Sequence, residues 1–216
     1  MLKTHGLQYR YADSGPLMDF PDLSLERGRE LLLLGASGTG KTTLLHLVAG
    51  MRTPSTGSVE LAGAPFSALP TAERVVVRGR SLGIVFQTAH FVRSLTVAEN
   101  LALARSLAGL NPDTARVQAL LTDLGLGHKV NARVDALSVG EQQRASIARA
   151  VVHEPGLILA DEPTSALDDA NTDAVLDLLR QQAANTGAAL LVVTHDQRLK
   201  DRMADRVELT PHSPAA

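Results

Sequence analysis

Residues 31–43 read Leu-Leu-Leu-Leu-Gly-Ala-Ser-Gly-Thr-Gly-Lys-Thr-Thr, and the rest of the chain is organised around this stretch. Four consecutive leucines predict a strand that is buried on both faces, as in a parallel sheet. The next residues follow the pattern Gly35-x4-Gly40-Lys41-Thr42, and residues 43–49 predict a helix that ends at Gly50. A strand, a glycine-rich turn and a helix in this order are the context in which this pattern binds phosphate.

The predicted loop assigns a chemical role to its parts. Glycines let the backbone approach phosphate oxygens, while N–H groups and the helix N-terminus supply positive potential. We expect Lys41 to reach the β- and γ-phosphates and the Thr42 hydroxyl to take one position on Mg²⁺. A glycine-rich turn without a ligand is the alternative, which the flanking elements disfavour. The candidate nucleotide-binding residues of the loop are Gly35, Ala36, Ser37, Gly38, Thr39, Gly40, Lys41, Thr42 and Thr43.

Composition excludes several other classes of function. The chain has 216 residues, which is enough for one α/β domain, and its formal net charge of −2 gives no reason to expect a nucleic-acid partner. Because there is no cysteine, disulfides and thiolate metal sites are excluded. No apolar run approaches the roughly 18 to 20 residues that cross a bilayer, and the N-terminus lacks the apolar segment of a secretion signal. We therefore expect a cytosolic chain whose membrane role depends on a partner.

Hydropathy patterns predict the remaining elements of one domain, residues 1–216. Short strands over 7–11, 22–26 and 58–63 are expected to form an antiparallel patch. Buried strands are expected over 82–87, 157–160 and 189–193, with helices from about Ala72 and over about 170–184. Helical spacing between Thr96 and Leu124, interrupted at Asn111-Pro112-Asp113, predicts a helical subdomain over about 88–150.

Two adjacent carboxylates follow the predicted strand 157–160. Asp161 and Glu162 follow an apolar strand downstream of a phosphate loop, which is the Walker B arrangement of P-loop NTPases. We expect Asp161 to hold Mg²⁺ through water, and Glu162 to orient and polarise the attacking water. An acidic pair by itself is usually solvated at a strand end, so this interpretation depends on the phosphate loop upstream.

Four further motifs occur in a recognisable order. Residues 137–144, Leu-Ser-Val-Gly-Glu-Gln-Gln-Arg, are similar to the signature motif of ATP-binding cassette (ABC) ATPases. Gln87 resembles the Q-loop glutamine, residues 165–168 resemble the D-loop, and residues 194–196, Thr-His-Asp, resemble the switch histidine motif. The resemblance covers nearly the whole chain. It implies an α/β P-loop NTPase core with a small antiparallel β-subdomain and a helical subdomain that carries the signature.

The resemblance assigns roles at the signature. Ser138 followed by Glu141 is a capping box, which independently predicts the start of a helix. In the family this helix tip faces the γ-phosphate held by another subunit, which carries over to Ser138 and Gly140. Val139 departs from the commoner glycine, so we expect no positive φ there.

The other family markers complete the expected site. The resemblance implies that the Gln87 amide oxygen binds Mg²⁺ or contacts the attacking water. It also implies that Asp168 of the D-loop is a nucleotide-binding residue. His195 is implied to hydrogen-bond the γ-phosphate and to hold Glu162 in position. Tyr11 corresponds by spacing to the aromatic residue that stacks on adenine. Tyr9 has the same strand parity and is the alternative.

The resemblance also implies partners. Two chains would meet head to tail around ATP, forming a homodimer that drives a membrane permease subunit. Residues 80–87 and 95–100 resemble the lipoprotein-releasing and macrolide-exporter branch, although Phe91-Val92-Arg93 departs from its usual Leu-Leu-Pro. This branch implies a permease with a large external domain and a place for the ATPase on the inner face of the plasma membrane.

Two alternatives stay open at this point. The first is a mechanotransmission ATPase that controls an envelope or cell-division complex without transport. The second is a soluble ABC protein of DNA repair or translation. The short interval between Gln87 and Ser138 and the single cassette disfavour the second alternative.

Overall fold

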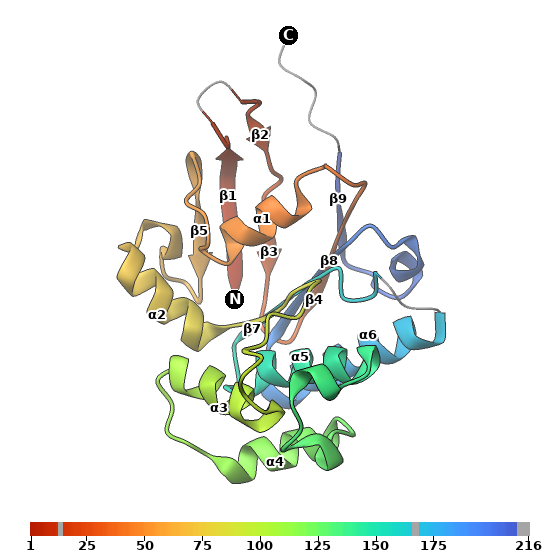
Figure 1. The fold of residues 1–216 in the computed structure, drawn as a ribbon. Helices are drawn as coiled ribbons and strands as arrows, with labels where there is room; N and C mark the ends of the chain where they lie inside the picture. The colour runs from red at the N-terminus through yellow and green to blue at the C-terminus, as the bar shows by residue number, and fades with distance from the viewer. Residues whose placement is uncertain (13–14, 166–168, 211–216) are drawn as a thin grey trace.

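The strand predicted from the four leucines is β4 (Glu30–Gly35), inside a five-stranded sheet of order β6-β7-β8-β4-β9. All strand pairs of this sheet are parallel. The computed structural model describes residues 1–12, 15–165 and 169–210 (Figure 1). Leucines of β4 are buried on both sides because β4 lies between β8 and β9 in the sheet and is covered on both faces. The other strands of this sheet are β6 (Leu82–Val85), β7 (Leu157–Asp161), β8 (Ala189–Thr194) and β9 (Arg206–Leu209).

A separate antiparallel sheet surrounds β1 (Leu2–Tyr9), which pairs with β2 (Met18–Asp19), β3 (Ser24–Leu25) and β5 (Thr56–Leu61). The strand predicted over 7–11 is wrong at both ends. It begins at Leu2 because pairing with β5 supplies its hydrogen bonds from that residue onward, and it ends at Tyr9. Tyr11 therefore lies beyond the strand. The strand predicted over 22–26 shortens to two residues, and β2 and β9 were not predicted.

The described residues form six α-helices. They are α1 (Lys41–Val48), α2 (Thr71–Ser81), α3 (Val97–Leu107), α4 (Thr114–Asp123), α5 (Val139–Val151) and α6 (Asp169–Thr186). Of these, α1, α2, α5 and α6 pack on the parallel sheet, while α3 and α4 pack on α5 (Figure 1). The segment 96–124 resolves into α3, capped by Thr96, and α4, capped by Asp113. The break predicted at Asn111-Pro112-Asp113 lies between them, because the Asp113 carboxylate accepts from the Arg116 N–H and starts a new helix.

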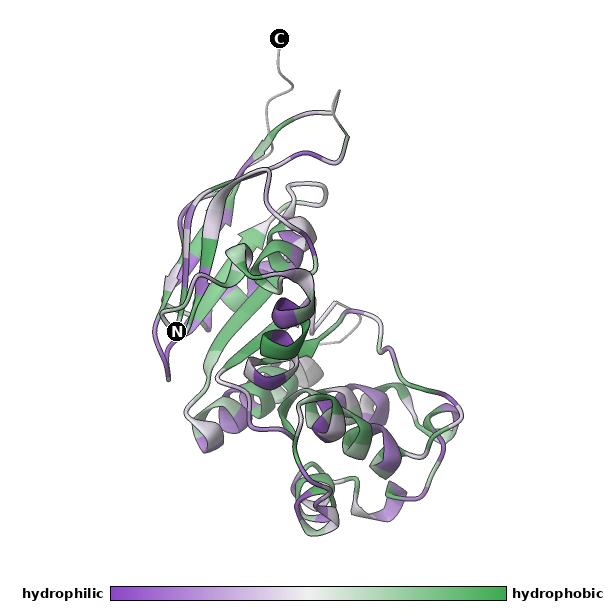
Figure 2. Cartoon of the chain, turned by 90° about the vertical axis from the view of Figure 1, so that its left-hand side faces the viewer, coloured by the Kyte–Doolittle hydropathy of each residue, from purple (hydrophilic) through white to green (hydrophobic). Residues whose placement is uncertain are grey.

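Two apolar cores lie on the two faces of the parallel sheet. Leu31 and Leu33 of β4 point toward α1 and the antiparallel sheet, whereas Leu32 and Leu34 point toward the core formed with α3 to α6. This alternation follows from the period of two in a strand. Figure 2 shows hydrophobic colour along the strands between these layers and hydrophilic colour over much of the outer helices. β4, which leads into the phosphate loop, is thus packed on both faces, and α1 belongs to the first of these cores.

Within the described residues, no helix has the length and apolarity needed to cross a membrane.

Truncation of a central leucine tests this packing. Leu191 of β8 is 0% exposed and pairs in register with Leu31 of β4 and Leu159 of β7. Leu191→Ala is expected to lower the free energy of unfolding by about 2–5 kcal/mol, because the rigid sheet cannot close the cavity. Leu107→Ala, at a side chain that is 72% exposed, is the control and should change stability by less than about 0.5 kcal/mol. Urea unfolding of both variants measures the difference, and equal losses would contradict the assignment of the core.

Candidate nucleotide-binding site

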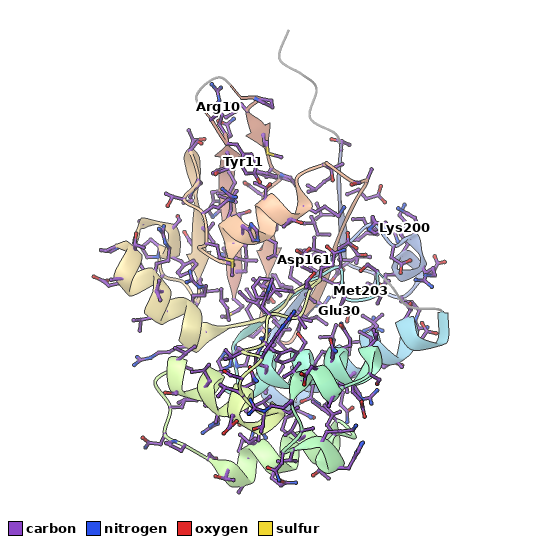
Figure 3. All side chains as sticks on the ribbon, in the orientation of Figure 1. Arg10, Tyr11, Glu30, Asp161, Lys200 and Met203 are labelled. Atoms are coloured by element: carbon purple, nitrogen blue, oxygen red, sulfur yellow. The ribbon has the colours of Figure 1, made fainter. Side chains whose placement is uncertain are left out.

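The carboxyl ends of the parallel strands meet at one edge of the sheet. Gly35 ends β4, Asp161 ends β7 and Thr194 ends β8, while Gln87 follows β6 after one intervening residue. Ligands of open α/β sheets bind at this edge. Figure 3 labels Asp161 near the middle of the molecule. A cavity of about 310 Å³ lies here, lined by Ser37, Gly38, Lys41, Thr42, Gln87, Glu162 and His195.

The phosphate loop has a backbone that only glycines adopt without strain. Gly38 has φ 82° and Gly40 has φ 90°, both in the left-handed region. Gly35 is required for a different reason, since a Cβ there would meet the Thr39 Oγ1 at 2.5 Å. Gly40 is the N-cap of α1, and no side chain accepts a capping hydrogen bond from the first turn. The loop therefore leads into a helix N-terminus with N–H groups available to an anion.

Lys41 lies inside this loop. Its side chain is nearly fully buried, and Nζ donates to the carbonyl oxygens of Gly35 at 2.8 Å and Ala36 at 3.1 Å. The Thr39 hydroxyl donates to the same Ala36 oxygen at 2.9 Å. Lys41 Nζ also lies 3.6 Å from the Glu162 Oε1. The cation thus faces the cavity between the loop and the acidic residue.

Asp161 carries an unsatisfied carboxylate oxygen. Burial, followed by the neighbouring charge of Glu162, raises the pKa of Asp161 to about 6, although Lys41 and the Thr42 hydroxyl oppose the shift. Oδ1 is buried and has no hydrogen-bond partner among the residues that the structure describes. A divalent cation that prefers oxygen ligands would satisfy this atom. The donor set of a carboxylate and a hydroxyl therefore suits Mg²⁺.

Glu162 lies in a different environment although it is the next residue. Its backbone has φ 49°, an uncommon conformation for a residue other than glycine, and its N–H donates to the Val193 carbonyl at 2.7 Å. Oε2 accepts from the Thr194 hydroxyl at 2.7 Å, and Oε1 lies 2.8 Å from the His195 Nδ1. Burial would raise the pKa of Glu162, but the hydrogen bonds from His195 and Thr194 more than offset it and the pKa is lowered. Glu162 is therefore the more readily ionised member of the acidic pair.

Sequence reasoning missed two threonines that organise this region. Thr194 is fully buried at the end of β8 and donates to Glu162, and Thr164 donates to the Asp196 Oδ2 at 3.0 Å. Arg198 holds the same Asp196 oxygen at 2.7 Å. The signal available in the sequence was a hydroxyl residue directly after an apolar strand and directly before the predicted switch histidine.

The signature segment begins α5. Ser138 is the N-cap, its hydroxyl accepts from the Glu141 N–H, and the Glu141 carboxylate accepts from the Ser138 N–H at 2.8 Å. The capping box confirms the predicted start of the helix. Val139 has no positive φ, as expected from its departure from glycine, and is 71% exposed. Gln143 of α5 donates to the Pro163 carbonyl at 3.0 Å, which joins this helix to the acidic pair. Among the described residues that line the cavity, neither Ser138 nor Gly140 occurs, and Asp168 lies outside the described residues.

Tyr11 lies beside the first turn of α1, directly after the phosphate loop. Its hydroxyl is 2.7 Å from the Thr43 Oγ1, in the first turn of α1, and the residue is 59% exposed. Tyr9, the alternative, has its hydroxyl occupied by Arg52 Nη1 at 2.8 Å. Tyr11 is therefore the more accessible of the two rings beside the phosphate loop.

Residues 19–165 match the sequence profile of the ABC transporter family. The chain belongs to the ABC transporter family. A lipoprotein-releasing system ATP-binding protein, LolD, of Xanthomonas campestris pv. campestris is 43% identical over 194 residues, or 89% of this chain and 81% of the relative. The LolD of Xanthomonas oryzae pv. oryzae is 40% identical over 212 residues, or 96% of this chain and 86% of the relative.

Solved ABC cassettes confirm the expected fold class. The ATP-binding cassette MJ0796, in a dimeric post-hydrolysis state bound to ADP and phosphate, has a TM-score of 0.86 and 27% identity, with 97% of this chain and 94% of the other covered. A second dimeric structure of the same cassette has the same TM-score and 28% identity. As an ABC protein, this chain is an ATPase: the nucleotide-binding subunit that acts with a membrane partner.

The raised pKa of Asp161 predicts a pH dependence of stability. In the absence of nucleotide and metal, the folded chain binds this proton more tightly than the unfolded chain. Ionisation of Asp161 therefore destabilises the fold progressively as the pH rises from the ordinary value of 3.8 to about 6. Asp161→Asn should melt at a higher temperature than the wild type, by a margin that grows through this window and is constant above it.

Thermal melts in EDTA measure this difference in melting temperature between Asp161→Asn and the wild type. Leu107→Ala, which removes an exposed side chain and no titratable group, is the control and should give a difference independent of pH. A margin that shrinks as the pH rises would show that Asp161 is stabilised in its charged form.

Proposed function

We propose that this chain is the ATPase of a lipoprotein-releasing or closely related extraction complex in a cell envelope. Two copies bind ATP between them and drive a membrane permease that has a large external domain. The two Xanthomonas relatives, at 43% and 40% identity, are named as ATP-binding proteins of a lipoprotein-releasing system. The observation that carries the proposal is the cavity in which Lys41, Thr42, Gln87, Glu162 and His195 converge.

The phosphate loop holds the triphosphate. Residues 35–43 supply backbone N–H groups and the N-terminus of α1, and Lys41 exchanges its bonds to the Gly35 and Ala36 carbonyls for the β- and γ-phosphates. Thr42, Gln87 and, through water, Asp161 are the proposed ligands of Mg²⁺. When bound, the ion neutralises charge on the phosphate oxygens. Tyr11 supplies the surface on which adenine stacks.

Glu162 is the proposed residue that orients the attacking water. Both of its carboxylate oxygens are engaged by Thr194 and His195 in the nucleotide-free chain, and its pKa is lowered. A carboxylate held in this way is a weak base, so water activation requires His195 to exchange its bond to Glu162 for the γ-phosphate. We infer that this exchange couples the arrival of the γ-phosphate to the release of Glu162.

The second subunit completes the site. Ser138 and Gly140 present the N-terminus of α5, whose exposed tip at Val139 is free to meet another surface. With Asp168 of the D-loop, they are proposed to contact the γ-phosphate held by the partner copy. ATP then stabilises the closed dimer because only that form makes both sets of contacts. Hydrolysis removes the difference and the dimer opens.

The proposed contact with the permease is the segment from Thr88 to about Leu110. It borders an apolar cavity of about 350 Å³ whose lining includes Phe86, Val92, Leu103 and Leu107. Leu107 is 72% exposed, which is unusual for a leucine at the rim of such a cavity. Occupation of this surface by a permease on the cytoplasmic side would place the chain at the inner face of the plasma membrane. The mechanotransmission alternative is not favoured, because the relatives are named for lipoprotein release.

Glu162→Gln tests the catalytic assignment. The substitution keeps the size of the side chain and removes its negative charge, so ATP hydrolysis should fall by at least about 100-fold while ATP binding persists. The variant should elute as a dimer on gel filtration with ATP and as a monomer without it. Lys41→Ala is the control and should show neither ATP binding nor the dimer. A monomeric Glu162→Gln protein at saturating ATP would contradict the role given to Glu162.

Copurification tests the partner. The tagged chain, expressed in its own host, should retain a four-helix membrane protein with a large external domain. Leu107→Asp should reduce the yield of this protein by about 10-fold or more, because a buried unpaired charge at an interface is costly. ATP binding by that variant should remain at the wild-type level. Recovery of a six-helix importer-type permease instead would refute the proposed branch.

A further inference from the structure

Tyr11 belongs to a cluster that the phosphate loop does not explain. The Arg52 Cζ lies 4.6 Å from the centroid of the Tyr11 ring, within the range of a cation–π contact. The rings of Tyr9 and Tyr11 meet edge to face, with centroids 5.0 Å apart and an interplanar angle of 87°. Arg52 also donates from Nη1 to the Tyr9 hydroxyl at 2.8 Å. Figure 3 labels Tyr11 beside the arrowhead of β1, above α1.

The members of this cluster come from separate elements. Tyr9 ends β1 and Tyr11 follows it, whereas Arg52 belongs to the turn after α1, where its N–H donates to the His46 carbonyl at 3.2 Å. Thr43, in the first turn of α1, holds the Tyr11 hydroxyl at 2.7 Å. The Tyr11 ring is therefore fixed through its hydroxyl by Thr43 and over its π system by Arg52.

Despite these contacts, Tyr11 remains largely open to solvent. Its exposed fraction of 59% leaves surface for another planar group. An exposed aromatic side chain would otherwise have to be ordered when a ligand stacks on it, and that ordering weakens binding. A ring that is already held at two points avoids this cost.

We propose that Arg52 is a positioning residue for the nucleobase, holding Tyr11 as a pre-formed stacking surface for the adenine of ATP. The inference rests on the proposed function, because it takes Tyr11 as the residue that stacks on the base. Arg52 contributes in two ways: its guanidinium attracts the ring electrostatically, and its bond to Tyr9 fixes the guanidinium plane. Arg52 itself does not contact the nucleotide. A solely structural link between β1 and the turn after α1 is the competing explanation.

The chain provides its own probe of this cluster. It contains no tryptophan and two tyrosines, Tyr9 and Tyr11, so its intrinsic fluorescence arises from this cluster alone. Titration with ATP should quench that emission as adenine stacks on Tyr11. Titration with inorganic tripolyphosphate, which lacks a base, reports occupation of the phosphate loop without stacking. The ratio of the two dissociation constants, both measured by calorimetry so that variants without Tyr11 can be compared, isolates the contribution of the base.

Substitutions at Arg52 then separate positioning from structure. Arg52→Met keeps an unbranched apolar stem and removes the guanidinium with its charge, and should weaken ATP binding about two- to fivefold. Tripolyphosphate binding should not change. Arg52→Lys should recover part of the loss, because it restores the cation without the planar fork. In a Tyr11→Ala background, which should itself weaken ATP binding by about fivefold or more, Arg52→Met should have no further effect.

Each contrary outcome identifies what fails. Equal weakening of ATP and tripolyphosphate by Arg52→Met would overturn the positioning role in favour of a structural one. An effect of Arg52→Met that persists in the Tyr11→Ala background, or no effect in the wild-type background, would also overturn it. Unchanged ATP binding by Tyr11→Ala would instead remove the base contact in the proposed function, and the inference with it. Lys41→Ala, which should lose both ligands, separately tests the phosphate loop.

Discussion

The site depends on the burial of β4 on both faces. Its leucines alternate between two apolar cores, so the strand cannot slip by one residue without exchanging their environments. That register fixes Gly35 at the carboxyl edge of the sheet, beside the last residues of β7 and β8. The packing of the strands consequently brings the phosphate loop, the acidic pair and the switch histidine together, and the contacts of Glu162 with Lys41 and His195 then link them.

Neighbouring carboxylates acquire opposite properties at this edge. Asp161 continues the buried strand, and burial raises its pKa to about 6. One residue later the backbone of Glu162 turns to φ 49°, and its side chain reaches Thr194 and His195, which lower its pKa. The turn of the backbone at Glu162 thus gives the two acids different environments, one with an unsatisfied oxygen that suits a metal ion and one that ionises more readily. The cost of this uncommon backbone conformation is consistent with a functional site.

The chain forms only part of the arrangement that its motifs imply. The tip of α5 is well formed, with both bonds of the capping box in place, but it does not line the cavity around Lys41. Gln143 nevertheless ties this helix to the backbone after the acidic pair. This hydrogen bond joins the signature helix to the residue that follows Glu162 within the same chain.

The sequence by itself determined the elements with strong local signals. Four leucines predicted a doubly buried strand, the glycine pattern predicted a loop before α1, and the spacing of Ser138 and Glu141 predicted the start of α5. Each of these signals acts over a few residues, through burial, positive φ or a capping hydrogen bond. The fold class and the family were implied by the resemblance of the ordered motifs to those of ABC ATPases.

Only the tertiary structure decided the rest. The true extent of β1 and the existence of β2 and β9 depend on pairing with distant strands, which local hydropathy does not encode. The engagement of Glu162 by Thr194, and the cover that Arg52 gives to Tyr11, join residues separated by 32 and 41 positions in the chain. Contacts of that range arise when packed layers bring chain segments together, so the sequence named the reacting groups while the fold set their environments.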